Sequence, residues 1–272
     1  MLRIPRSVVP NSFTVGNMFF GFMSIVIAVN QQNFMLAAWM IGGAALMDAL
    51  DGKIARITNS SSKFGVEYDS LADVVSFGVA PSVLIYQFYF IHVPQQSLGM
   101  LFSFMPLLFG SIRLARFNVE LTGFTKSHFS GLPIPAAAIT IGSYILLVEQ
   151  YFDGSPYPQI LITVTALTSL LMVSNVRYEI LPKLTFKGSG KQKVIFLVFI
   201  ILVIVVLILV VLDFKIIYML IFPTMILYIL GGLVTSIFIK TSNRRKMKKM
   251  ESERRSGAER RLDDLEEDED EI

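Results

Sequence analysis

Long apolar runs alternate with short polar segments along most of the chain. Four of these runs are Ser12 to Val29, Val74 to Ile91, Val194 to Leu212 and Ile216 to Ile239. A run of roughly 18 or more apolar residues is long enough to cross the hydrocarbon core of a bilayer as a helix. Because backbone N–H and C=O groups cannot stay unpaired in lipid, we expect these segments to be helices.

Shorter apolar segments extend the pattern to about eight membrane-crossing helices. Their expected centres lie near Gly21, Ile41, Val83, Leu107, Ile141, Thr165, Val203 and Leu227. The run Leu101 to Ile112 alone would also suit a buried helix of a soluble protein, but its neighbours favour a span. The predicted fold class is therefore all-α, in a polytopic integral membrane protein.

The composition agrees with a membrane protein and excludes two kinds of site. Hydrophobic residues make up 53% of the chain, which is unusual for a soluble globular domain. The chain has no cysteine, which excludes a disulfide framework and a thiolate metal site. The N-terminal MLRIPRSVVPNSF is basic and then apolar, but no small-residue cleavage site follows, so we do not interpret it as a secretory signal.

Lysine and arginine gather in every second connection between the predicted spans. The connections at 30–33, 92–97, 151–158 and 213–215 hold one lysine in total, and the alternate connections are basic. Basic connections tend to face the cytoplasm. The pattern predicts that both termini are cytoplasmic. We expect a multi-pass protein of a prokaryotic cell membrane.

The C-terminal part differs from the rest of the chain. The polar link FKGSGKQK sets the last two predicted spans apart, so we expect a membrane domain of about six spans at 1–180 and two additional spans at 181–240. Residues 241–272 are first basic and then acidic, ending in LDDLEEDEDEI. Such charge blocks predict a disordered cytoplasmic tail.

Four aspartates stand out beside the second and third predicted spans. Asp48 and Asp51 are three residues apart where the second span ends, and Asp69 and Asp73 are four apart where the third begins. Residues at these intervals share one face of a helix. The polar segment ITNSSSK between the two pairs predicts a turn. Two helices joined by this turn would bring four carboxylates together at the cytoplasmic edge of the membrane.

Carboxylates at such close quarters repel one another, and a divalent cation is the simplest compensation. Oxygen ligands without cysteine or a nearby histidine point to magnesium, manganese or calcium, with phosphate often completing the coordination. Gly52, Ala55 and Gly65 lack bulk and let a ligand approach, while Arg56 offers a fork for phosphate oxygens. A plain membrane–water boundary is the alternative, but a boundary needs no fixed spacing, and ionisable residues at the start of a span are costly.

The spacing of these residues resembles the motif of the CDP-alcohol phosphotransferase family, D-x2-D-G-x2-A-R, a spacer, and G-x3-D-x3-D. All motif positions are filled, by Asp48, Asp51, Gly52, Ala55, Arg56, Gly65, Asp69 and Asp73. The segments PNSFTVGN, TNSSSKFGVEYDSLADVVSFGVAP, RLARFN and GLPIPAAA are similar to the phosphatidylserine synthase branch of this family. The resemblance covers the chain through the sixth predicted span.

The resemblance implies a membrane enzyme with a six-helix core that transfers a phosphatidyl group from a CDP-linked lipid to an alcohol and releases CMP. The branch implies CDP-diacylglycerol and L-serine as substrates and Mg²⁺ or Mn²⁺ as cofactor. Asp73 is the implied general base. The implied metal ligands are Asp48, Asp51, Asp69 and Asp73. The implied contacts to the CDP-lipid are Gly52, Ala55, Arg56 and Gly65, with Asn11 and Thr14 as weaker candidates.

Other polar residues are candidates for binding serine or a lipid phosphate. They are Lys63, Arg113, Arg116 and Asn118. Arg113 and Arg116 lie three apart at the cytoplasmic end of the fourth span, where ordinary positive-inside anchors are an equal alternative. The resemblance also implies contacts with membrane lipids and a homodimer, and nothing in the chain indicates a nucleic-acid partner.

Two alternative functions stay open from the sequence. Within the family, the acceptor could be glycerol 3-phosphate, inositol or choline, or the donor could carry an archaeal ether lipid. A polytopic ion transporter belongs to a different class. Transport would place charges in mid-membrane on several spans, whereas these aspartates gather at one end of two spans, which argues against it.

Overall fold

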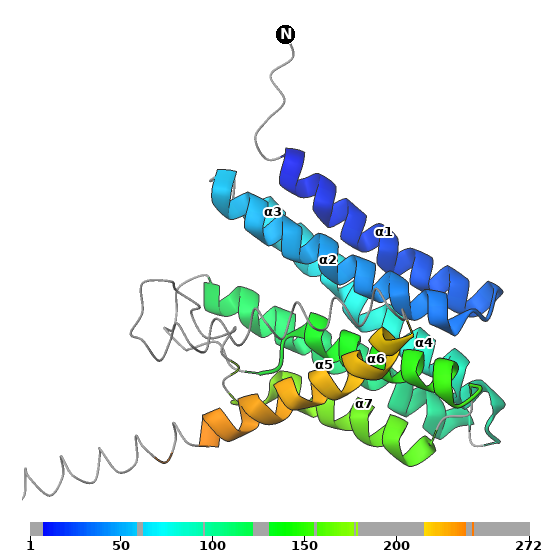
Figure 1. Cartoon of the computed structure of the whole chain (residues 1–272). Coiled ribbons are helices and arrows are strands. Elements are labelled where there is room, and N and C mark those ends of the chain that lie inside the picture. Colours follow the sequence, from blue (N-terminus) through cyan, green and yellow to red (C-terminus); the bar gives the residue numbers. More distant parts are fainter. Residues whose placement is uncertain are drawn as a thin grey trace, which may run out of the picture.

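Helices make up the described part of the protein (Figure 1). The computed structural model describes residues 8–58, 62–94, 96–121, 131–154, 157–176, 178, 215–237 and 241. These residues contain no strand. The predicted all-α fold class is confirmed.

The helices follow the apolar runs, and each predicted centre except Val203 falls within one. They are α1 (Val8–Asn30), α2 (Phe34–Thr58), α3 (Lys63–Asp73), the π-helical η1 (Val74–Val79), α4 (Ala80–Phe88), the 3₁₀ turn η2 (Phe90–His92), α5 (Gln96–Leu121), α6 (Ile134–Tyr151), α7 (Pro158–Val173) and a last helix, Ile216–Ile237. Among the described residues, six helical stretches could cross a membrane by length and composition, and α7 is shorter. The span predicted near Val203 and the tail 242–272 lie outside the described residues, and the division into domains stays a prediction.

The segments α3, η1, α4 and η2 form one continuous stretch, Phe64–His92, which we call the rod. Ser62 caps its start, because the Ser62 hydroxyl accepts a hydrogen bond of 3.0 Å from the backbone N–H of Gly65. Farther along, Pro81 has no N–H and would crowd a regular helix. The wider π-helical turn directly before it relieves this crowding, and there the N–H of Ala80 bonds to Val75, five residues back. The rod therefore continues through a proline.

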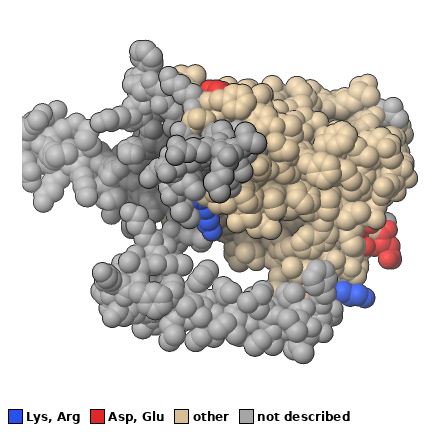
Figure 2. Space-filling model, turned by 90° about the horizontal axis from the view of Figure 1, so that it is seen from above, with Lys and Arg blue, Asp and Glu red and all other residues tan. Residues whose placement is uncertain are grey.

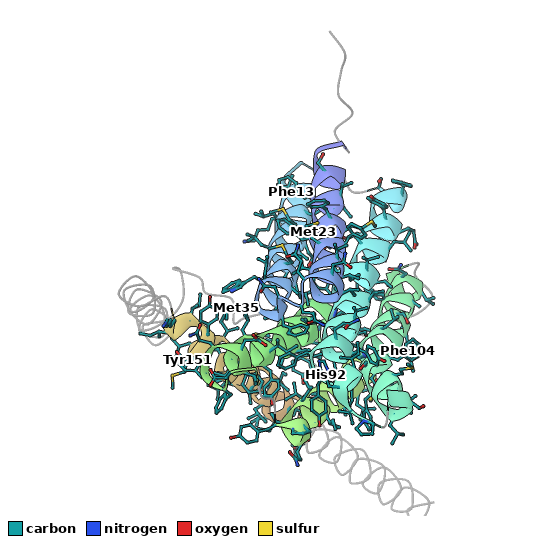
Figure 3. The ribbon with its side chains drawn as sticks, turned by 90° about the vertical axis from the view of Figure 1, so that its right-hand side faces the viewer. Phe13, Met23, Met35, His92, Phe104 and Tyr151 are labelled. Atoms are coloured by element: carbon teal, nitrogen blue, oxygen red, sulfur yellow. The ribbon has the colours of Figure 1, made fainter. Side chains whose placement is uncertain are left out.

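The lightly charged connections gather at one end of the bundle. Met35 follows the α1–α2 connection, His92 precedes the α4–α5 connection, and Tyr151 precedes the α6–α7 connection. Figure 3 places all three in its lower half, while Phe13 of α1 lies near the top. The first two spans and the rod therefore run between two ends, and the aspartates lie towards the Phe13 end.

Helix α1 has apolar residues outside and polar residues inside. Val15, Phe19 and Phe22 are 51%, 57% and 55% exposed, as expected of a surface that faces lipid. Thr14 and Asn17 are fully buried on the other side. Uncharged residues also cover most of the described surface in Figure 2. Polar side chains inside a membrane bundle usually serve packing or function.

The last helix packs against the bundle through aromatic rings. The ring of Tyr218 lies 5.9 Å from that of Trp39 in α2, and the ring of Phe222 lies 5.4 Å from that of Tyr144 in α6. In addition, the Tyr151 hydroxyl donates a hydrogen bond of 3.0 Å to the carbonyl of Lys215. These contacts hold the helix Ile216–Ile237 against α2 and α6.

Replacing Gly21 with alanine is expected to destabilise the protein. At Gly21, α1 comes so close to the rod that an added Cβ would lie 2.6 Å from the Cα of Ser76. Because a backbone atom cannot give way cheaply, we expect a loss of about 1–3 kcal/mol, measured as a lower melting temperature in detergent. Gly42→Ala is the control, since its Cβ would meet only the Trp39 ring at 3.8 Å. Equal melting temperatures for the two variants would contradict the close approach.

Candidate active site

Three aspartates from two helices converge at one point. Asp48 comes from the last turns of α2, while Asp69 and Asp73 lie four residues apart on α3. One carboxylate oxygen of each lies within 4.8 Å of the other two. The placement of Asp69 beside Asp73 follows from the sequence, because residues four apart on a helix share a face. The structure thus brings together three of the four predicted ligands.

The fourth aspartate, Asp51, is turned towards α1. It is 7% exposed, and one of its carboxylate oxygens accepts a hydrogen bond from the Thr14 hydroxyl. Its other oxygen is buried with no hydrogen-bond partner among the described residues. Asp51 still lies close enough to Asp48 and Asp69 for their charges to interact. It therefore borders the cluster of three.

Helix α1 also supports Asp73, through a residue that the sequence analysis did not select. The side-chain amide of Asn17 donates a hydrogen bond of 3.0 Å to Asp73, and both residues are buried. The backbone carbonyl of Asn17 in turn accepts a hydrogen bond of 2.8 Å from the Ser76 hydroxyl. Asn17 follows Thr14 by three residues, so the two share a face of α1. That spacing, inside the segment PNSFTVGN, was the available signal.

The carboxylates suit a divalent cation. The cluster offers three oxygen donors within reach of one ion, and hard oxygen ligands are those that Mg²⁺, Mn²⁺ and Ca²⁺ prefer. One oxygen of Asp69 is buried and has no hydrogen-bond partner among the described residues. A buried carboxylate oxygen without a donor is unfavourable, and a bound cation would satisfy it. The residues present therefore fit a metal ion.

The small residues of the motif lie on the same two helices as the aspartates. Gly52 is exposed near the end of α2, and Gly65 is partly buried at the start of α3. The backbones of Asn11, Ala55 and Arg56 belong to α1 and α2, but their side chains lie outside the described residues. Thr14 is buried and bonded to Asp51.

The candidates for binding serine separate into different surroundings. Arg113 of α5 interacts electrostatically with Asp73. Arg116 is exposed and donates a hydrogen bond of 3.4 Å to the Asn175 side chain. The Asn118 amide donates hydrogen bonds of 3.1 Å to Glu67 and 3.1 Å to Ser70, both in α3. The side chain of Lys63, the fourth candidate, lies outside the described residues. Arg113 therefore borders the aspartates, and Asn118 ties α5 to α3.

Comparison with known proteins identifies the family. A sequence model of the CDP-alcohol phosphatidyltransferase family matches residues 7–173. The chain belongs to this family. The match covers α1 to α7 and all four aspartates, and it ends before Tyr178 and the last helix. The protein is therefore a transferase. Members of this family generally require a metal ion.

Relatives within the CDP-alcohol phosphatidyltransferases carry related names. A Helicobacter pylori protein named CDP-diacylglycerol–serine O-phosphatidyltransferase is 40% identical over 197 residues, covering 72% of this chain and 81% of the relative. A Methanothermobacter thermautotrophicus protein named archaetidylserine synthase is 38% identical over 171 residues, covering 62% and 68%. A Methanocaldococcus jannaschii protein with the same name as the first is 36% identical over 141 residues, covering 52% and 62%.

Proposed function

We propose that the protein transfers the phosphatidyl group of CDP-diacylglycerol to L-serine, giving phosphatidylserine and CMP. The observation that carries the proposal is the three-aspartate cluster, with Asp73 buried within it and Arg113 beside it. The names of the relatives support serine as the acceptor. The serine-synthase-like segments of the sequence point the same way.

In this reaction the serine hydroxyl attacks the phosphorus that carries the diacylglycerol. A bond forms between serine oxygen and phosphorus, and the bond to the bridging oxygen breaks, so that CMP leaves with the electron pair. Asp73 takes the hydroxyl proton, because serine is a weak nucleophile near neutral pH. The hydrogen bond from Asn17 holds Asp73 in place for this step.

Asp48, Asp51, Asp69 and Asp73 are the proposed metal ligands, and Mg²⁺ or Mn²⁺ is the proposed ion. When bound, the cation supplies charge neutralisation for the pyrophosphate and the leaving CMP. Gly52, Ala55, Gly65 and Arg56 are proposed to contact the CDP-lipid, together with Asn11. Thr14 orients Asp51 through its hydrogen bond. Positioning and electrostatics dominate phosphoryl transfer, which suits a site with several fixed polar groups.

The site is proposed to face the cytoplasm, at the level of the lipid headgroups. The supporting observation is the alternation of basic and lightly charged connections along the sequence. Lipid tails would stay in the bilayer, while serine and CMP exchange with the aqueous phase. Both termini and the charged tail are proposed to lie on the same side.

An acceptor series tests the proposed reaction. The protein purified in detergent is given CDP-diacylglycerol, Mn²⁺ and, in turn, L-serine, glycerol 3-phosphate, inositol or choline, and CMP release is followed. We expect turnover with serine and background release with the others. Comparable turnover with glycerol 3-phosphate would contradict serine as the acceptor. Background release with every alcohol would contradict the reaction itself.

The lipid donor has a second candidate. The relative named archaetidylserine synthase makes an ether-lipid donor the alternative to CDP-diacylglycerol. Running the serine assay with an ester-linked and an ether-linked CDP-lipid distinguishes the two, because the preferred donor gives the higher kcat/KM.

A further inference from the structure

Two tyrosines beyond the family-matched residues pack against each other, and one of them interacts with Arg113. Tyr178 follows α7, and Tyr228 belongs to the last helix. Their rings are 5.8 Å apart and tilted by 37°. Arg113 interacts electrostatically with Tyr228 as well as with Asp73. These residues therefore connect the last helix with the aspartate cluster.

Two donors of this group are buried and have no hydrogen-bond partner among the described residues. They are the Tyr178 hydroxyl and Nε of Arg113. Tyr178 is only 9% exposed, and burial, with a smaller contribution from Tyr228, raises the pKa of its hydroxyl to about 12. The hydroxyl therefore keeps its proton at neutral pH and remains a donor. Buried donors normally have acceptors, so an acceptor from a ligand is expected here.

The last helix fixes the position of Tyr178. Gly232 lies four residues after Tyr228, on the same face of that helix. The Tyr178 ring packs so closely on Gly232 that an added Cβ would overlap it. The helix thus contributes Tyr228, which interacts with Arg113, and holds Tyr178 against it.

We propose that Arg113, Tyr178 and Tyr228 form a subsite that binds the carboxylate of the acceptor. The inference rests on the proposed serine transfer and adds residues from outside the family-matched part of the chain. A guanidinium offers only donors, and phenolic hydroxyls can donate as well, which suits an anion. Because Arg113 is also in range of Asp73, a serine held by its carboxylate would have its hydroxyl close to the base.

The test compares single-hydroxyl deletions in the full-length protein. Tyr228→Phe and Tyr178→Phe keep the rings and remove one donor each. We expect the KM for L-serine to rise about 10-fold, the effect of one charge-assisted hydrogen bond, with little change in kcat or in the KM for CDP-diacylglycerol. Tyr218→Phe is the matched control, because it lies on the same helix with its ring against Trp39. Its KM for serine should equal that of the wild type.

The outcomes separate this subsite from the proposed function. A phosphate of the CDP-lipid could accept hydrogen bonds from the same donors. A raised KM for CDP-diacylglycerol with an unchanged KM for serine would overturn the carboxylate assignment and indicate a phosphate-binding subsite. Unchanged KM values for both substrates in both variants would overturn the subsite while leaving serine transfer intact. Wild-type protein without serine-dependent CMP release would overturn the proposed function first, and the subsite with it.

Discussion

Replacing Asp73 with asparagine is expected to lower serine-dependent CMP release by about 100- to 10,000-fold, the range typical for loss of a general base. Asparagine has nearly the shape of aspartate but cannot take the serine proton. Its side-chain oxygen can still accept the 3.0 Å hydrogen bond from Asn17, so the fold is expected to persist. Initial rates at saturating serine and CDP-diacylglycerol measure the effect, with size-exclusion profiles in detergent as the check on folding.

Asp153→Asn is the matched control for this variant. Asp153 is exposed in the α6–α7 connection, where its φ of 48° is a value that asparagine tolerates well. The same chemical change there should leave the rate unchanged. Wild-type rates in Asp73→Asn would assign the proton transfer to another group.

Removing divalent cations is expected to abolish CMP release, and adding Mg²⁺ or Mn²⁺ in excess is expected to restore it. The three clustered carboxylates are proposed to repel the pyrophosphate of the donor when no cation is present, so both substrate binding and departure of CMP would suffer. The experiment follows activity after EDTA treatment and again after each metal is added back. Full activity in EDTA would contradict a metal site at the aspartates.

Direct metal binding provides a readout that does not depend on turnover. Mn²⁺ titration followed by electron paramagnetic resonance is expected to show weaker binding in Asp69→Asn than in the wild type. The loss should exceed the roughly 10- to 100-fold cost of removing an outer-shell partner, because Asp69 is a proposed direct ligand. Asp153→Asn again serves as the control, and equal affinities for Asp69→Asn and wild type would remove Asp69 from the ligand set.

The sequence predicted the helices well because membrane spans depend on long apolar runs. The start of α3 was also predictable, since Ser62 caps it at the end of a segment rich in serine and asparagine. The turn predicted before it lies largely outside the described residues. The π-helical turn Val74–Val79 was not predicted. Pro81 alone indicates that a helix is disturbed but does not say whether it kinks, ends or widens.

The candidate site was predicted in part. Fixed spacing on two helices places Asp48, Asp69 and Asp73 on faces that can meet. The sequence did not show which distant segments meet: Asn17 and Asp73 are 56 residues apart, and Tyr228 belongs to a helix with no recognisable motif. Their proximity depends on how the helices pack, which spacing along a single helix does not determine.

The polar side of α1 has a consequence for biogenesis. If the spans enter the bilayer in order, α1 and α2 can pair some of their polar groups with each other. The Thr14 hydroxyl donates a hydrogen bond to Asp51, and the Ser24 hydroxyl donates one of 2.8 Å to the carbonyl of Ala37. The side-chain amide of Asn17 finds its acceptor, Asp73, only when the rod is in place. An unpaired amide among acyl chains is unfavourable. Packing of the third span against the α1–α2 hairpin is therefore favoured, because it pairs this amide.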